Sequence, residues 1–77
     1  MTLKIISTED ILFNGEVTMV TLPGEAGEFT VLRNHAALVS TLVPGNVTYV
    51  ADGEPVQLPV NGGVVDVDNN VVSVCVY

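Results

Sequence analysis

The stretch GVVDVDNNVVSVCV, residues 63–76, decides the fold of this chain. Two valine-rich runs, Gly63–Val67 and Val71–Val76, flank Asp68-Asn69-Asn70. Valine favours extended backbone, and Asp and Asn tolerate the left-handed conformations that a tight turn requires. The stretch therefore predicts two strands joined by a tight turn.

The rest of the chain repeats this pattern, because turn signals recur about every six to ten residues, as in an antiparallel sandwich or barrel. Further strands are expected at Leu3–Ser7, Ile11–Phe13, Val17–Leu22, Phe29–Leu32, Leu38–Val43, Val47–Val50 and Val56–Val60. The only stretch with helical character, Arg33–Val39, is too short to form a helix unaided. We therefore expect one domain over residues 1–77 with an all-β fold, a flattened antiparallel β-sandwich of about 8–10 short strands.

Four short motifs indicate where these strands end. Asn14-Gly15 and Asp52-Gly53 have the composition of two-residue hairpin turns, since both positions tolerate positive φ. In Pro44-Gly45, proline presets the first corner, and glycine is expected to take the positive φ of a type II turn. Pro23-Gly24 is expected to end the strand that precedes it.

The charge balance limits the partners that the chain can have. Two Lys and Arg residues stand against nine Asp and Glu, for a net charge of −7. Nucleic acids and anionic lipids both require clustered cations, so neither is an expected partner, whereas a partner with basic patches is favoured. Cys75 is the only cysteine, which excludes an internal disulfide and favours a reducing compartment. Neither a signal peptide nor a transmembrane helix is expected.

The sequence offers no catalytic, metal or cofactor site. His35 is the only histidine; Ser40 and Cys75 are nucleophiles by type alone, and no motif joins either one to it. A packing or docking role for His35 is therefore favoured over catalysis. The spacing of the possible ligands matches neither a zinc site nor an EF-hand, and the glycines lack the helix and lysine of a phosphate loop.

The acidic loop around Ala26-Gly27 has two interpretations that the residues alone leave open. Glu25 and Glu28 bracket this dipeptide. They form either a solvated hairpin tip or an exposed acidic loop that faces a cationic partner.

A series of landmarks resembles the N-terminal β-sandwich domain of the ε subunit of bacterial F-type ATP synthases. The landmarks, in chain order, are Ser7, Phe13-x-Gly15, Gly24-Glu25-x-Gly27-Glu28, His35-Ala36-x-Leu38, Pro44-Gly45, Gly62-Gly63, Asp66-Val67 and Asn70-x-Val72. The resemblance extends from Leu3 to Val76. The chain departs from the family at Thr30, at Arg33-Asn34 and at Ala37, where glycine, Pro-Gly and proline are usual.

The resemblance implies a non-catalytic rotor subunit of the central stalk of a proton-translocating ATP synthase, which couples c-ring rotation to the γ subunit for ATP synthesis. The positions that match the loop facing the polar loops of the c-ring are Glu28, Thr30 and Leu32. Those that match the side facing γ are Ser7, His35 and Ser40. Such a subunit lies peripherally at the cytoplasmic face of the bacterial inner membrane and meets the membrane only through the complex.

Two further expectations concern the extent of the chain and the alternative to a rotor subunit. Most family members continue into an inhibitory C-terminal helical hairpin, and these residues end where it would begin, so we expect the chain to lack it. The alternative is a free-standing β-sandwich that binds a ligand or acts as an adaptor. Only Tyr49 and Tyr77 combine a ring with a polar tip, which argues against sugar binding.

Overall fold

The computed structural model describes residues 1–77 as nine strands and no helix. The strands are β1 (Thr2–Ile6), β2 (Ile11–Glu16), β3 (Met19–Gly24), β4 (Gly27–Leu32), β5 (Leu38–Leu42), β6 (Gly45–Ala51), β7 (Glu54–Val60), β8 (Gly63–Asp68) and β9 (Val71–Val76). The expected all-β class and the number of strands are confirmed, and Arg33–Val39 forms no helix.

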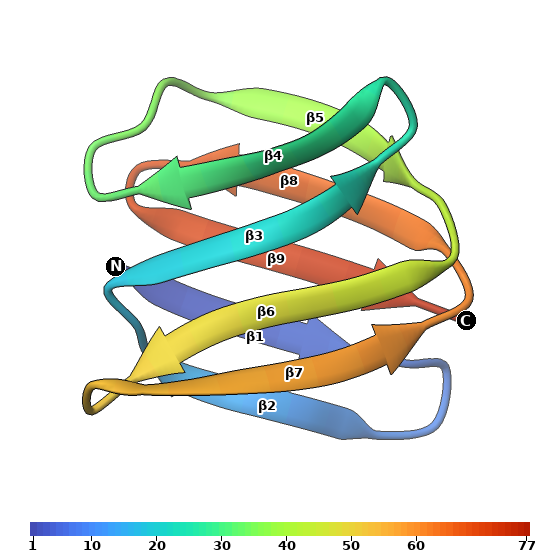
Figure 1. Ribbon diagram of the computed structural model, residues 1–77, viewed down its shortest axis with the longest axis horizontal. Helices are drawn as coiled ribbons and strands as arrows, with labels where there is room; N and C mark the ends of the chain where they lie inside the picture. Colours follow the sequence, from blue (N-terminus) through green and yellow to red (C-terminus); the bar gives the residue numbers. More distant parts are fainter.

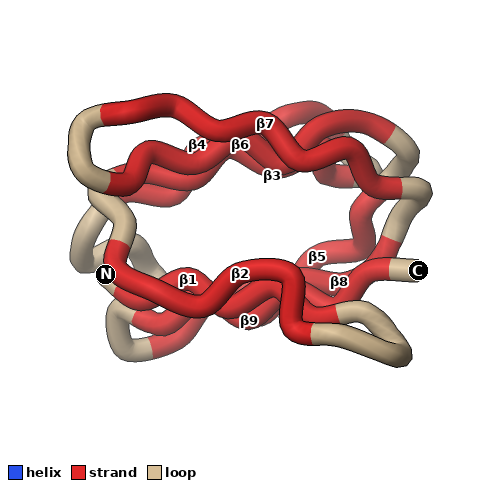
Figure 2. Tube along the Cα trace, turned by 90° about the horizontal axis from the view of Figure 1, so that it is seen from below, coloured by secondary structure: helices blue, strands red, loops and turns tan.

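The strands form two stacked layers, which Figure 1 shows one behind the other and Figure 2 shows edge-on. Sheet I has the order β2-β1-β9-β8-β5, and sheet II has the order β4-β3-β6-β7. A single residue pair, Gly24 with Leu42, joins β3 to β5 and links the layers at one side. The architecture is therefore a β-sandwich, as the sequence predicts.

One strand pair departs from the antiparallel arrangement expected throughout. β1 runs parallel to β9, with Thr2 opposite Val71 and Ile6 opposite Cys75. Every other pairing in the two sheets is antiparallel. The first and last strands of the chain are not joined by a turn, so no local signal fixes their relative direction.

The core lies between the two layers and consists almost entirely of aliphatic side chains. The buried cluster comprises Leu3, Ile5, Val17, Val20, Leu22, Val31, Leu42, Val47, Tyr49, Val60, Val65, Val67, Val72, Val74 and Val76. Alternate residues of each strand point inward, as Val72, Val74 and Val76 do on β9. The rings of Phe13 on β2 and Tyr49 on β6 lie 4.3 Å apart between centroids, so an aromatic contact crosses from one layer to the other.

Two expected hairpin turns are confirmed, and a third is wrong. Asp52-Gly53 and Asn69-Asn70 both have positive φ at each residue, which is the geometry of a type I′ turn. Asn14-Gly15 instead lies inside β2, with Asn14 opposite Lys4 on β1. Pairing with β1 keeps this dipeptide extended, so tertiary contacts override its preference for a turn.

The two Pro-Gly motifs also differ from expectation. β3 runs through Pro23 to Gly24 rather than ending before them. Gly45 begins β6 and is not among the glycines with positive φ, so Pro44-Gly45 is not the expected type II turn. A Cβ on Gly45 would lie 2.9 Å from the Cβ of Pro23, so close packing of β6 on β3 requires glycine there.

Candidate functional site

The three residues expected to face the c-ring lie together on one face of β4. Glu28, Thr30 and Leu32 are exposed and alternate with the inward-pointing Phe29 and Val31. Because β4 pairs only with β3, these residues line an edge of sheet II. We call them the β4 strip; it presents a carboxylate, a hydroxyl and an apolar side chain in one row.

Two hydrogen bonds hold the β3–β4 hairpin, whose tip lies beside the β4 strip. The backbone N–H of Glu25 donates a 2.9 Å hydrogen bond to the carbonyl of Thr41 on β5. On the strip itself, the hydroxyls of Thr21 and Thr30 are 2.9 Å apart and hydrogen bonded. Glu25 and Glu28 are both exposed, and the single salt bridge of the structure, between Met1 and Glu16, involves neither. The tip therefore presents two free carboxylates on a braced loop.

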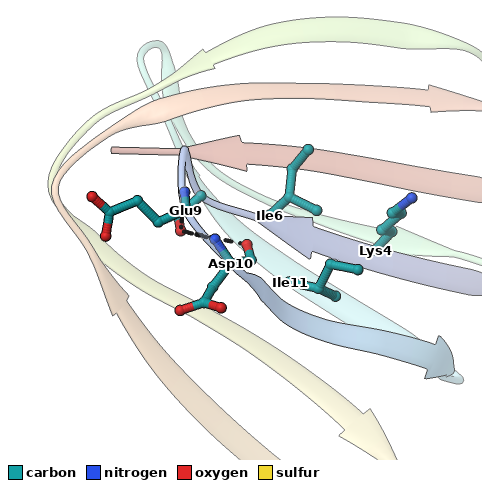
Figure 3. Close-up of a pocket in the computed structure, with 6 residues that line it drawn as sticks. Lys4, Ile6, Glu9, Asp10 and Ile11 are labelled. Atoms are coloured by element: carbon teal, nitrogen blue, oxygen red, sulfur yellow. Dashed lines mark hydrogen bonds between the residues drawn. The ribbon is translucent and has the colours of Figure 1, made fainter.

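Ser7 shapes the loop between β1 and β2, which Figure 3 shows in close-up. Its hydroxyl accepts hydrogen bonds from the backbone N–H groups of Asp10, at 3.1 Å, and Glu9, at 3.4 Å. Its own N–H donates to the carbonyl of Asp10, at 2.8 Å. The loop borders a hollow of about 630 Å³ lined by Lys4, Ile6, Ser7, Glu9, Asp10 and Ile11. Ser7 thus fixes the loop and also lines an open surface hollow.

His35 lies in the loop between β4 and β5 and makes local contacts. Its Nδ1 is 2.7 Å from the carbonyl oxygen of Ala36, which can only accept, so Nδ1 donates. No hydrogen bond joins the ring to a serine, a cysteine or a carboxylate. The neighbouring Asn34 is tied to the β8–β9 turn, because its Oδ1 accepts a 2.9 Å bond from the side-chain amide of Asn70. The loop is therefore held in place, and His35 has no partner for acid–base catalysis.

The three residues expected to face γ lie apart from one another. Ser7 follows the end of β1, whereas His35 precedes the start of β5, at the opposite end of sheet I. Ser40 is half-buried on β5 opposite the buried Val65, and its hydroxyl donates to the carbonyl of Thr41 at 3.1 Å. The structure brings the β4 strip together but leaves these three residues distributed over sheet I and its loops.

Sequence reasoning missed a row of apolar side chains across the outer face of sheet I. Ile11, Ile6, Cys75 and Val64 lie opposite one another on the neighbouring strands β2, β1, β9 and β8. We call them the apolar row. The signal in the sequence is the doubling of β-branched residues, Ile5-Ile6 and Val64-Val65, because two consecutive apolar residues in a strand place one on each face.

Glu16, the last residue of β2, is held by two contacts with the start of the chain. The hydroxyl of Thr2 donates a 2.7 Å hydrogen bond to Glu16, and this bond, with the Met1 ammonium at 3.1 Å, lowers the pKa of the Glu16 carboxyl below its usual value. Both contacts tie β1 to β2 at the surface.

Neither a metal-binding group nor a membrane-spanning helix is found in the structure. No group of three or more His, Cys, Asp or Glu side chains is placed to hold a metal ion. No helix has the length and apolar character needed to cross a membrane.

Curated relatives of this chain are ε chains of ATP synthases. It is 44% identical over 71 residues to the ATP synthase epsilon chain of Bordetella petrii, covering 91% of this chain and 50% of the relative. The epsilon chain of Nitratiruptor sp. is also 44% identical, over 69 residues, covering 88% and 54%. The chain therefore spans about half the length of the curated relatives that it matches.

Two solved structures have the same fold. A chain in the Euglena gracilis mitochondrial ATP synthase, described as OSCP/F1/c-ring, superposes with a TM-score of 0.89 at 26% identity, covering 96% of this chain and 48% of that one. A chain of the Tetrahymena thermophila central stalk/c-ring gives 0.83 at 15% identity, covering 97% and 61%, which bears on the fold alone. The family model described as ATP synthase, Delta/Epsilon chain, beta-sandwich domain matches residues 1–77. This chain therefore belongs to the ATP synthase delta/epsilon chain β-sandwich family.

Proposed function

We propose that this chain is a non-catalytic rotor component of a proton-translocating F-type ATP synthase, in which it couples c-ring rotation to the γ subunit. The observation that carries the proposal is the family match over residues 1–77. The likeness to a chain of a solved F1/c-ring assembly supports it. The chain has its place at the cytoplasmic face of the bacterial inner membrane and is held there through the other subunits.

The β4 strip is the proposed contact with the polar loops of the c-ring. Glu28, Thr30 and Leu32 are exposed along one edge of sheet II, on a hairpin braced to β5. A free carboxylate beside a hydroxyl suits partner loops that carry basic and polar side chains. Because a rotor transmits torque through its contacts, a braced edge strand is a better seat than a mobile loop.

The γ subunit is proposed to contact sheet I and its loops. Ser7, His35 and Ser40 mark this side, at the end of β1, before β5 and on β5. Their separation means that γ must extend along sheet I to reach all three. A contact of that length resists sideways load better than a single point does.

The charge of Glu28 provides the test of the c-ring contact. In membrane vesicles that contain the assembled ATP synthase, Glu28→Lys should weaken the contact by about tenfold, roughly 1.4 kcal/mol, because it replaces attraction by repulsion. Proton pumping per ATP hydrolysed should then fall, while the chain stays folded, since Glu28 is exposed. Pumping is followed with a pH-sensitive dye, and hydrolysis as phosphate release.

The matched control is Glu54→Lys, which makes the same charge change on β7, at the other edge of sheet II. This variant should pump normally. If Glu28→Lys and Glu54→Lys vesicles pump equally well, the assignment of the β4 strip to the c-ring is wrong.

A further inference from the structure

The apolar row forms a band on the outer face of sheet I, exposed except at the half-buried Ile6. Ile11 is 63% exposed and Val64 47% exposed, and Cys75 is exposed between them. Ile6, Val64 and Cys75 also line a hollow of about 270 Å³, together with Ser7, Thr8, Val76 and Tyr77. An apolar band of this kind on a small acidic chain is typical of a contact surface.

The register of sheet I aligns the band across four strands. Ile6 lies opposite Ile11 on one side and Cys75 on the other, and Val64 lies opposite Cys75. An irregularity in the β1–β2 pairing, between Ile5 and Ile6, brings Ile11 into this row. Strands lie about 4.8 Å apart, so three intervals make a row of about 14 Å, perpendicular to the strands.

This spacing fits the ridge of an α-helix that crosses the strands. Side chains on one face of a helix recur about every 5.4 Å, which is close to the spacing between strands. A helix that follows the row would therefore place one apolar side chain near each strand. A strand in the same direction would advance about 3.3 Å per residue and point alternate side chains away.

Charged groups border one end of the band. Glu9 and Asp10 share the 630 Å³ hollow with Ile6 and Ile11, and both are exposed and outside the structure's one salt bridge. Figure 3 shows both side chains at the loop end of this hollow and Lys4 farther along the strand. Two carboxylates against one ammonium favour a partner that is basic beside its apolar ridge.

We propose that the apolar row is the seat of an amphipathic helix from another rotor subunit. The helix lies across β2, β1, β9 and β8 with its apolar ridge on the row and its basic residues beside Glu9 and Asp10. This inference rests on the proposed function, because the partner that carries the helix is a rotor subunit. It adds which face of the sandwich is covered and what kind of segment covers it.

The native Cys75 reports directly on whether the row is covered. Its alkylation by iodoacetamide is compared between the free chain and the rotor complex isolated from membranes through a tag on this chain. We expect alkylation to be at least tenfold slower in the complex. The control is Gln57→Cys in a Cys75→Ser background, an exposed position on β7, which should react equally fast in both states. Equal alkylation of Cys75 in both states would overturn the proposal.

Substitutions that add a charge separate the apolar row from the other layer of the sandwich. Val64→Asp should weaken association with the rotor partner at least tenfold, because it places a charge in the apolar band. Gln57→Asp is the control: Gln57 is exposed on β7, in the other layer, and its variant should bind normally. Reversal of both Glu9 and Asp10 to lysine should slow association and reduce its salt dependence. Equal binding by the Val64→Asp and Gln57→Asp variants would contradict the proposal.

Cross-linking distinguishes a helix from an extended segment. A photo-reactive maleimide is attached in turn to Ile11→Cys and Val64→Cys variants in the Cys75→Ser background, and the cross-linked partner residues are identified by mass spectrometry. Across about 14 Å, the two sites should lie roughly nine residues apart on a helix and about four apart on a strand. A separation near four overturns the helix. If the chain binds a rotor subunit but Cys75 stays reactive, only this inference fails; if it binds none, the proposed function fails with it.

Discussion

At the scale of single residues, the space around a glycine determines how much a substitution there costs. Gly63 has a φ of 152°, and a Cβ there would overlap the carbonyl oxygen of Cys75 on β9. Gly53, in the β6–β7 turn, also has positive φ, at 77°, but a Cβ there would meet nothing within 4 Å. The sequence marks Gly53 as a turn residue, whereas the close approach at Gly63 follows only from the pairing of β8 with β9.

Alanine substitutions at these two glycines should differ in cost. Gly63→Ala should lower the free energy of unfolding by at least about 3 kcal/mol, because a strand must move away from its neighbour. Gly53→Ala should cost only about 1–2 kcal/mol, the penalty for a left-handed alanine. Urea unfolding of both variants measures the difference, and equal losses would contradict the geometry of the β8–β9 pair.

At the scale of secondary-structure elements, the sequence locates strands better than it locates their neighbours. Valine runs mark β8 and β9 to within a residue, because local propensity and alternation agree there. Asn14-Gly15 misleads, because its turn preference is overridden by pairing with β1. The parallel β1–β9 pair and the apolar row could not be predicted, since both depend on which distant strands become neighbours.

The β8–β9 turn also holds the loop that carries His35. The side-chain oxygen of Asn70 accepts a 2.6 Å bond from the N–H of Asn34, and its amide donates to Asn34 at 2.9 Å. Asn70→Gly suits the φ of 60° but removes both bonds, so it should destabilise the chain by about 1 kcal/mol.

Hydrogen exchange shows whether the effect is local. The N–H of His35, which donates to the carbonyl of Leu32 at 3.1 Å, should exchange faster in the Asn70→Gly variant. Asn69→Gly, next to it in the same turn, makes neither side-chain bond and should be nearly neutral. Unchanged protection of His35 in the Asn70→Gly variant would show that Asn70 does not hold this loop.

At the scale of the whole molecule, the two edges of sheet II differ in the neighbours that they can accept. β7 has prolines at positions 55 and 59, which have no N–H to donate to a further strand. β4, at the other edge, has no proline and carries Glu28, Thr30 and Leu32. The sandwich is therefore closed to strand addition at β7 and exposes the β4 strip at the opposite edge, where the c-ring contact is proposed.

For the site, as for the fold, local pattern shows which residues share a strand face but not which distant strands become neighbours. The family resemblance names Glu28, Thr30 and Leu32 as loop positions; the structure places them on β4, where strand alternation brings them to one face. The sequence does not show that Ser7, His35 and Ser40 lie far apart. These residues come from a loop at each end of sheet I and from an edge strand. Their distances depend on sheet order, which local pattern does not determine.

The central claim is that this chain works as part of a rotor. The most direct measurement is isolation of the tagged chain from bacterial membranes in mild detergent, followed by mass spectrometry of the subunits that accompany it. The account predicts the γ subunit and the c-ring in fixed proportion to the chain. Recovery of the chain alone, or with a small ligand and neither of these subunits, would contradict it and favour a free-standing binding module.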